Sequence, residues 1–377
     1  MRVAIFEEAG AAPALQEAEH TPLQDNEVLV RIAGVGVCHT DLTALNGNVP
    51  LPTPAVLGHE GAGVVEAIGA DIQDLEVGDH VVLTFDTCGD CRACSAGHPA
   101  YCELFAPLNY FGTRLDGTTT MVQGDREVHG SWFGQSSWGT HAVASARNAV
   151  KVDKDAPLHL LGPLGCGLLT GAGTVLNVLR PQPGQSIGFW GMGTVGLAGL
   201  MAAKALGCEN IVAVDLNDGR LALARELGAT HTFNPSSAKD VVWEILEATG
   251  GLDCSMEAVG LGSVVREALA PLRSPGVCAT VGLQTLENDI TIDQGHLLIG
   301  RTLTGVIEGD ADPHQLIPRL IQMWQDEQFP FDRLVAEYPL EDINVALDDF
   351  HAGKVIKPIL IPGAPTTGDD NDVKEEK

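Results

Sequence analysis

Four cysteines lie close together in the first third of the chain, at Cys88, Cys91, Cys94 and Cys102. The segment that carries them contains Gly and Pro and few large apolar side chains. Four thiolates at this spacing suit a tetrahedral zinc ion, and four protein ligands leave no open position for a substrate. The pattern predicts a structural zinc; buried or redox thiols and an isolated iron–sulfur cluster are alternative interpretations.

A second set of metal-binding residue types, Cys38, His59 and Cys166, is dispersed along the chain. Two thiolates and one imidazole provide three zinc ligands and leave the fourth position open for water or substrate, as a catalytic zinc requires. Each residue alone has a simpler explanation, because a single Cys usually packs in the core and a single His usually makes structural hydrogen bonds. The residue types allow a catalytic zinc, but the spacing alone does not select it.

The six residues from Gly191 to Gly196 match the pattern G-x-G-x-x-G, and Asp215 follows nineteen residues after Gly196. The motif lies between an apolar run and an apolar helical pattern. There, glycines let the backbone approach a pyrophosphate at a helix N-terminus, and Asp215 can bind a ribose 2′-hydroxyl. A carboxylate would repel a 2′-phosphate, so NAD is predicted over NADP. An ordinary strand–helix turn with Asp215 as a cap is the alternative.

These residues require two kinds of scaffold. Before about residue 160, short apolar runs such as 28–32 and 63–68 alternate with turn signals, which predicts an irregular β-rich domain with long loops. After Cys166, strands and helices alternate, which predicts a doubly wound parallel sheet. The expected strands are 186–190, 210–215 and 277–281, and the expected helices end at Leu206 and span 220–227.

The expected fold class is therefore α/β, with two domains. The first domain would comprise residues 1–166, with the four-cysteine lobe at 88–102, and would resume at 307–363. The dinucleotide-binding domain would span 167–306, and residues 364–377 read as a loose tail.

The chain has 377 residues, 22 Lys plus Arg, 50 Asp plus Glu and a formal net charge of −28. Such an acidic surface repels phosphate backbones and anionic membranes, which argues against nucleic-acid and membrane-surface roles. The acidic N-terminus does not resemble a signal peptide, and no apolar run is long enough to span a membrane. A soluble, cytoplasmic protein is expected, in which nine cysteines do not form a disulfide framework.

With these motifs in this order, nearly all of residues 1–363 resembles the medium-chain, zinc-dependent alcohol dehydrogenases. The segments Phe133–Trp138, Leu164–Gly167 and Thr170–Gly173 resemble the aryl (benzyl) alcohol dehydrogenase branch. The resemblance implies a GroES-like catalytic domain, a Rossmann domain, NAD, two zinc ions per chain, and a homodimer or homotetramer acting on a small alcohol or aldehyde.

The resemblance also implies roles for individual residues. Cys38, His59 and Cys166 would bind the catalytic zinc, with Asp41 and Glu60 behind them; Asp41 would hold the second ring nitrogen of His59. The residues implied near the cofactor are His39, Thr170, Gly191, Gly193, Thr194, Val195, Gly196, Asp215, Arg220, Val259, Val281, Leu283 and Lys357. Those implied in the substrate pocket are Trp132, Phe133 and Ile307, for which plain core packing is the alternative.

The implied reaction is reversible oxidation of a primary, aromatic or allylic alcohol to the aldehyde. Zinc would lower the pKa of the alcohol hydroxyl, Thr40 would take its proton, and NAD would accept the hydride. Many relatives end this relay with a His where this chain has Thr43. A threonine cannot act as a base near neutral pH, so the proton would leave through water or another group.

Three other functions fit parts of the sequence. The same scaffold could oxidise another alcohol: an aliphatic alcohol, a terpene alcohol, a polyol or a formaldehyde adduct. The second alternative is a metal-free quinone reductase on the same scaffold. Such an enzyme would lack Cys38, Cys166 and the four-cysteine lobe, all of which are present in this chain. The third alternative is a zinc-stabilised binding protein without enzymatic activity. NADH formation from a benzylic alcohol would exclude it.

Overall fold

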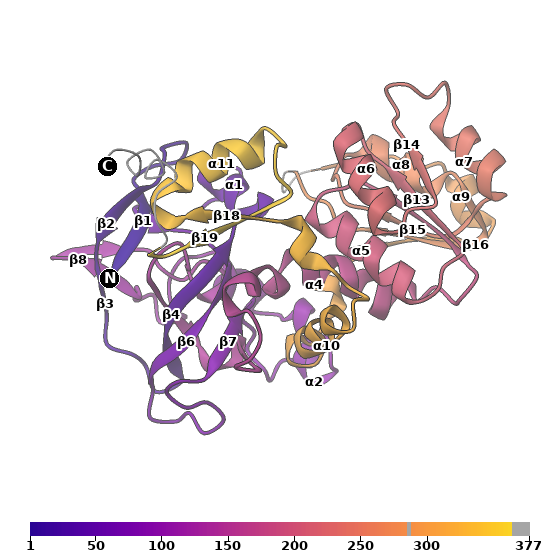
Figure 1. The fold of residues 1–377 in the computed structure, drawn as a ribbon. Coiled ribbons are helices and arrows are strands. Elements are labelled where there is room, and N and C mark those ends of the chain that lie inside the picture. Colours follow the sequence, from indigo (N-terminus) through magenta and orange to yellow (C-terminus); the bar gives the residue numbers. More distant parts are fainter. Residues whose placement is uncertain (285–287, 364–377) are drawn as a thin grey trace, which may run out of the picture. The chain divides into compact units, whose positions relative to one another are not determined.

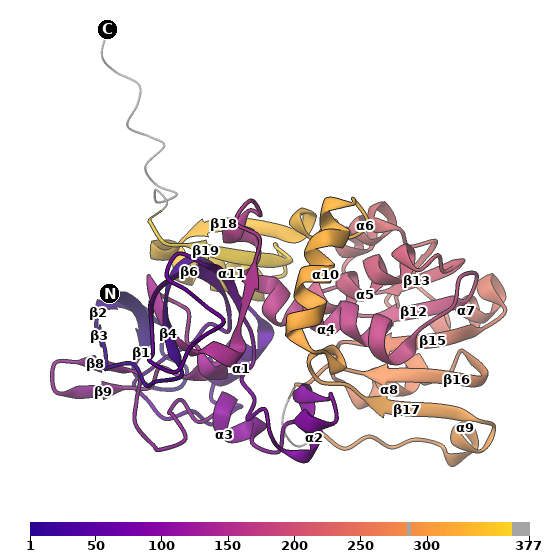
Figure 2. The same ribbon diagram turned by 90° about the horizontal axis from the view of Figure 1, so that it is seen from below.

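The computed structural model describes residues 1–284 and 288–363, so the tail expected at 364–377 lies outside the described residues. The chain folds into two compact units (Figures 1 and 2). The first unit consists of Met1–Cys166 together with the chain from Asp332 onward, and the second consists of Gly167–Phe331. None of the helices in the described part has the length and apolar character that a membrane crossing requires.

In this division, the return to the first unit comes at Asp332, whereas the sequence analysis placed it at residue 307. The difference has a packing reason. Helix α10 (Pro313–Gln325) and the turn η7 (Glu308–Asp310) both contact α4 (Gly167–Gly173), the first helix of the second unit. The buried face of α10 consists of Pro313, Leu316, Ile317, Leu320 and Ile321.

The first unit is built mainly from antiparallel strands. Within the described residues its main sheet has seven strands, in the order β11-β7-β6-β4-β19-β18 with β10 also paired to β4. These strands are β4 (Glu27–Gly36), β6 (Glu60–Ile68), β7 (His80–Leu83), β10 (His141–Ser145), β11 (Ala149–Val152), β18 (Val335–Pro339) and β19 (Lys357–Ile361). Two smaller sheets contain β1 (Arg2–Phe6), β2 (Ala14–Glu17) and β5 (Ala55–Val56), and β3 (Glu19–His20), β8 (Met121–Gln123) and β9 (Arg126–Val128). The helices are α1 (His39–Leu45), α2 (Arg92–Ser95), α3 (Phe105–Asn109) and α11 (Ile343–His351).

The register of β4 against β6 brings distant residues together. Gly36, the last residue of β4, pairs with Glu60, the first residue of β6. A Cβ atom at Gly36 would lie 2.0 Å from a carboxylate oxygen of Glu60, so only glycine leaves room for that side chain. Cys38 follows Gly36 by two residues and His59 precedes Glu60 by one, so the strand pairing brings both to one end of the sheet.

The second unit contains the predicted doubly wound sheet, which is thereby confirmed. In the described residues its six parallel strands have the order β14-β13-β12-β15-β16-β17. The strands are β12 (Ser186–Trp190), β13 (Asn210–Val214), β14 (His231–Phe233), β15 (Leu252–Glu257), β16 (Leu272–Thr280) and β17 (Arg301–Gly305). The remaining helices are α5 (Thr194–Ala205), α6 (Asp218–Leu227), α7 (Val241–Thr249), α8 (Gly262–Leu269) and α9 (Gln294–Leu298). Helices α7 and α8 share one apolar core with β12, β13, β15 and β16, whereas α5 packs against α6 and α4.

Candidate active site

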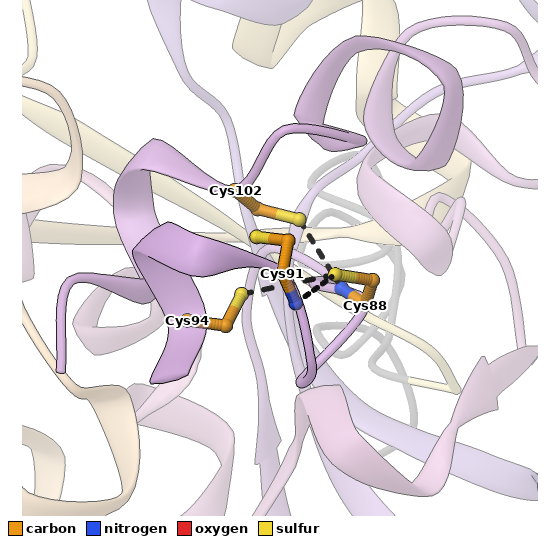
Figure 3. Close-up of side chains that lie close together, drawn as sticks. All are labelled: Cys88, Cys91, Cys94 and Cys102. Atoms are coloured by element: carbon orange, nitrogen blue, oxygen red, sulfur yellow. Dashed lines mark hydrogen bonds between the residues drawn. The ribbon is translucent and has the colours of Figure 1, made fainter. Parts of the chain in front are cut away.

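The four cysteines of the lobe converge on one point in the first unit, as Figure 3 shows. The sulfur atoms of Cys88, Cys91, Cys94 and Cys102 lie within 4.8 Å of one another, and all four residues are free cysteines. Helix α2 begins directly after Cys91 and carries Cys94, and a 3₁₀ turn, η1 (Pro99–Tyr101), leads into Cys102.

Backbone N–H groups point at these sulfurs. The N–H of Cys88 donates to Sγ of Cys102 (3.2 Å), and the N–H of Cys91 donates to Sγ of Cys88 (3.3 Å). Hydrogen bonds from the backbone of Cys94 and Glu103 lower the pKa of Cys91 to about 6, whereas burial raises the pKa of Cys88 to about 12. Four thiolates this close repel one another, and a divalent cation removes that cost. The donor set therefore fits zinc.

The dispersed set also converges. One ligand atom each from Cys38, His59, Glu60 and Cys166 lies within 4.8 Å of the others. Cys38 is the N-cap residue of α1, and Cys166 follows the 3₁₀ turn η5 (Gly162–Gly165). The hydroxyl of Thr84, just beyond β7, donates to the carbonyl of Gly165 (2.7 Å) and ties this turn to the main sheet.

Asp41 holds His59 in place, as expected. Both side chains are fully buried, and Nδ1 of His59 lies 2.7 Å from Oδ1 of Asp41. The carboxylate also accepts hydrogen bonds from the backbone N–H groups of Cys38 and Gly58, each at 3.1 Å. The contact to Cys38 closes the first turn of α1, because Asp41 occupies its third position.

The environment of His59 favours a cation at its other ring nitrogen. Nε2 of His59 is buried and has no hydrogen-bond partner among residues 1–284 and 288–363. Burial alone would lower the pKa of His59, but the charges of Asp41 and the Cys38 thiolate outweigh it and raise the pKa well above its usual range. A hydrogen bond from Cys166 lowers the pKa of Cys38 well below its usual range. A buried nitrogen beside two thiols is therefore a position that fits zinc.

Lys357, which the resemblance implies near the cofactor pyrophosphate, forms a buried ion pair with Glu60. It is 1% exposed, and its Nζ donates to both carboxylate oxygens of Glu60 (2.9 and 2.7 Å) and to the carbonyl of Val37 (2.9 Å). Burial raises the pKa of Glu60 to about 7, although Lys357 opposes the shift. The carboxylate of this buried ion pair lies within 4.8 Å of the ligand atoms of Cys38, His59 and Cys166, and sequence analysis did not predict the pair.

The two residues considered for the proton path, Thr40 and Thr43, lie on α1 together with His39, which the resemblance implies near the cofactor. Oγ1 of Thr40 lies 3.8 Å from Sγ of Cys38, and Thr40 does not cap the helix, because Cys38 is the N-cap residue. Thr43 is buried, and its hydroxyl donates to the carbonyl of Thr40 (2.7 Å). The Thr43 hydroxyl is therefore bound to the helix backbone. His39 is exposed at the start of α1.

Aromatic side chains gather beside His59. The ring of Phe133 stacks on the imidazole, with centroids 4.4 Å apart and planes inclined by 24°. Trp132 and Phe133 are both buried, and the indole N–H of Trp132 donates to Oδ1 of Asp41 (3.0 Å), a contact with no sequence signal. Tyr110 packs against both of these rings. Ile307, the third expected pocket residue, is half-buried in the second unit.

In the second unit, the Gly-rich turn joins β12 to α5 as predicted. A Cβ atom at Gly196 would lie 1.8 Å from the carbonyl oxygen of Gly191, so this turn requires glycine there. Asp215 follows β13, and its carboxylate accepts hydrogen bonds from the backbone N–H groups of Met192 (2.6 Å) and Asn217 (2.8 Å). Asn217, and not Asp215, is the N-cap residue of α6.

The other residues implied near the cofactor also belong to the second unit, apart from His39 and Lys357. Thr194 and Val195 open α5, Arg220 lies in the first turn of α6, and Val259, Val281 and Leu283 follow β15 and β16. The hydroxyl of Thr170 on α4 donates to Glu308 (3.3 Å).

Glu257 at the end of β15 was not foreseen. Its buried carboxylate accepts hydrogen bonds from the N–H groups of Val259 and Gly260, both at 2.6 Å, and from the hydroxyl of Thr280 (3.0 Å). It therefore joins the loops that follow β15 and β16.

Comparison with known proteins follows the same two-part division. Residues 24–154 match the family model for the alcohol dehydrogenase GroES-like domain, and residues 194–325 match the model for zinc-binding dehydrogenases. Geraniol dehydrogenase from Castellaniella defragrans is 44% identical over 96% of this chain and 97% of its own length.

Solved structures also resemble this chain over most of its length, and two of them illustrate the match. An alcohol dehydrogenase zinc-binding domain protein from Burkholderia ambifaria is 46% identical, with a TM-score of 0.94 over 96% of this chain and 98% of its own. Benzyl alcohol dehydrogenase from Acinetobacter calcoaceticus is 41% identical, with a TM-score of 0.93 over 96% of this chain and 99% of its own.

Proposed function

Because this chain belongs to the zinc-dependent, medium-chain alcohol dehydrogenase family, we propose that it oxidises primary aromatic or allylic alcohols to aldehydes, reversibly, with NAD. The observation that carries the proposal is the convergence of Cys38, His59 and Cys166 around a buried imidazole nitrogen. The alcohol class is supported by the relatives named for geraniol and benzyl alcohol, whose carbinol carbons adjoin a double bond or an aromatic ring. It is also supported by the aromatic side chains beside His59.

Cys38, His59 and Cys166 would hold the catalytic zinc, and the four cysteines of the lobe would hold a structural zinc. When bound, the catalytic zinc acts as a Lewis acid that lowers the pKa of the alcohol hydroxyl, and NAD accepts the hydride. With zinc bound, the His59 imidazole would be neutral, and Asp41, 2.7 Å from Nδ1, would accept the hydrogen bond of its Nδ1–H. The lone pair on Nε2 then remains available for the metal.

Thr40 would accept the hydroxyl proton of the alcohol and pass it outward. Its hydroxyl lies next to the sulfur of Cys38, whereas the hydroxyl of Thr43 is bound to the Thr40 carbonyl. The next carrier would therefore be water or another group, and not Thr43.

The Gly-rich turn and the N-terminus of α5 would bind the pyrophosphate of NAD. Asp215 already lies against this turn, because it accepts a hydrogen bond from the Met192 N–H. Its carboxylate would bind the ribose hydroxyl and exclude a 2′-phosphate. Arg220, Thr170, Val259, Val281 and Leu283 would contact other parts of the cofactor.

A substrate panel tests the proposal. Benzyl alcohol, cinnamyl alcohol, geraniol, a linear aliphatic alcohol and a polyol are compared by kcat/KM with NAD and with NADP. We expect the three benzylic or allylic alcohols to give the highest values, and NAD to be the better cofactor. A preference for the aliphatic alcohol or the polyol would contradict the substrate class, and absence of NADH formation from every alcohol would contradict the activity.

Thr40→Val is expected to lower kcat by about 10²-fold, the usual scale for losing a proton-transfer group. The change keeps the side-chain shape and removes only the hydroxyl, so zinc content and NAD binding should be unchanged. Thr40→Ser should retain most of the activity. Steady-state kinetics and melting temperatures of both variants provide the measurement, and a fully active Thr40→Val enzyme would show that Thr40 carries no proton.

Asp215→Ala is expected to weaken NAD binding by about 1–3 kcal/mol, because a charge-assisted hydrogen bond to the ribose is lost. Discrimination against NADP should fall at the same time. Asp218→Ala is the matched control, since Asp218 is an exposed carboxylate three residues further on. Dissociation constants for both cofactors provide the measurement. Unchanged NAD and NADP affinities in Asp215→Ala would reduce Asp215 to a turn-stabilising residue.

A further inference from the structure

Trp132 is linked directly to the carboxylate that holds His59. It is 0% exposed, and its indole Nε1–H donates to Oδ1 of Asp41 at 3.0 Å. The same oxygen is 2.7 Å from Nδ1 of His59 and accepts the backbone N–H of Gly58 at 3.1 Å. Three donors therefore meet at one carboxylate oxygen, while the second oxygen accepts the N–H of Cys38.

These four hydrogen bonds determine how Asp41 is oriented. A carboxylate held by two backbone N–H groups alone can still tilt about its Cβ–Cγ bond. The indole approaches from a different part of the chain, so it restrains this rotation and, through Asp41, the plane of the His59 ring.

The indole is itself well fixed. The backbone N–H of Trp132 donates to Oγ of Ser136 (2.9 Å), and that hydroxyl donates to the carbonyl of Val56 (2.6 Å). Val56 is the last residue of β5, three residues before His59. Trp132 is therefore fastened to the strand segment that leads into the histidine.

The residues after Trp132 hold His59 from other sides. Phe133 stacks on the imidazole, and Nε2 of Gln135 donates to the His59 carbonyl (2.9 Å). Oε1 of Gln135 also accepts a hydrogen bond from the N–H of Gly61 (3.1 Å). The Gln135 amide therefore binds the backbone on both sides of Glu60. The short segment 132–135 therefore contacts Asp41, the His59 ring and the backbone around His59.

We propose that Trp132 is a positioning residue for the metal ligand His59, acting through its hydrogen bond to Asp41, and not a wall of the substrate pocket. The inference rests on the proposed function, because it assumes that His59 binds the catalytic zinc. Removing the indole N–H leaves Oδ1 of Asp41 with two donors and loosens the restraint on the orientation of the imidazole. Loss of such an outer partner typically weakens metal binding by about 10–100-fold.

Trp132→Phe tests the inference, with Trp138→Phe as the matched control. Trp138 is also 0% exposed, and its indole N–H has no hydrogen-bond partner within the described ranges. Both substitutions remove the same atoms from a buried site, so the lost packing is similar. Only Trp132→Phe removes a hydrogen bond to Asp41. The zinc-loaded proteins are exposed to a chelator, and zinc per chain is followed by elemental analysis.

We expect Trp132→Phe to bind the catalytic zinc about 10–100-fold more weakly, and Trp138→Phe to match the unsubstituted protein. Zinc retained by the four-cysteine lobe serves as an internal measure of folding. Equal zinc retention in the two variants would overturn the inference, as would a raised alcohol KM in Trp132→Phe with unchanged zinc retention. If the unsubstituted protein itself binds a single zinc, the proposed function fails and the inference falls with it.

Discussion

Cys166→Ala is expected to remove one zinc per chain and to lower kcat/KM for alcohol oxidation by about 10³-fold or more. Cys166 supplies one of three protein ligands, and two ligands hold a catalytic zinc poorly. Lewis-acid activation of an oxygen contributes several kcal/mol to transition-state stabilisation, and each 1.36 kcal/mol corresponds to a factor of ten. Elemental analysis and steady-state kinetics on the same preparation measure both effects.

Cys208→Ala is the matched control for this experiment. Cys208 is a half-buried thiol outside both cysteine groups, and burial raises its pKa to about 11. Its removal should leave two zinc ions per chain and unchanged kinetics. A Cys166→Ala protein that keeps two zinc ions and full activity would exclude Cys166 from the metal site.

Lys357→Met is expected to lower the free energy of unfolding by about 3–5 kcal/mol, the usual cost of removing one partner from a buried ion pair. Glu60 and Lys357 are both fully buried, so water cannot replace the lost ammonium. The carbonyl of Val37 would also lose its donor. Urea denaturation of the zinc-loaded protein provides the measurement.

Lys354→Met serves as the control for Lys357→Met. Lys354 forms an ion pair of similar length with Asp349 (2.7 Å), but its side chain is 67% exposed. Exposed pairs contribute about 0–1 kcal/mol, so this substitution should have a small effect. The double variant Glu60→Gln/Lys357→Met should be more stable than Lys357→Met alone, because no unpaired charge remains. Equal unfolding free energies for Lys357→Met and Lys354→Met would contradict the account.

The second unit was predictable because its signals are local. Strand β12 spans Ser186–Trp190, as the apolar run predicts, and β13 differs from its prediction by one residue. Buried parallel strands read as continuous apolar runs, and the glycines of the turn mark where the strand ends. Helix α6 ends before Gly228, as expected.

The first unit was harder because its irregular strands depend on distant partners. The apolar run 28–32 covers only the first half of β4, which extends from Glu27 to Gly36 and has bulges in its pairing with β6. The local pattern cannot show where bulges shift the register.

Motif spacing identified the four-cysteine lobe, and the family resemblance pointed to Cys38, His59 and Cys166, but neither showed the contacts that support these residues. Glu60 and Lys357 are 297 residues apart in the chain and meet through the pairing of β4 with β6 and β19. The indole of Trp132 likewise reaches Asp41 across 91 residues. Nothing in the local sequence distinguishes a tryptophan that donates to a buried carboxylate from one that packs in a core.

Zinc stoichiometry combined with activity tests the central claim most directly. Protein purified without chelator is analysed for zinc per chain, and NADH formation from benzyl alcohol is followed while a chelator removes the metal in steps. The account predicts two zinc ions per chain, with activity falling in proportion to loss of the one held by Cys38, His59 and Cys166. Full activity in a chain that retains a single zinc, held by Cys88, Cys91, Cys94 and Cys102, would contradict it.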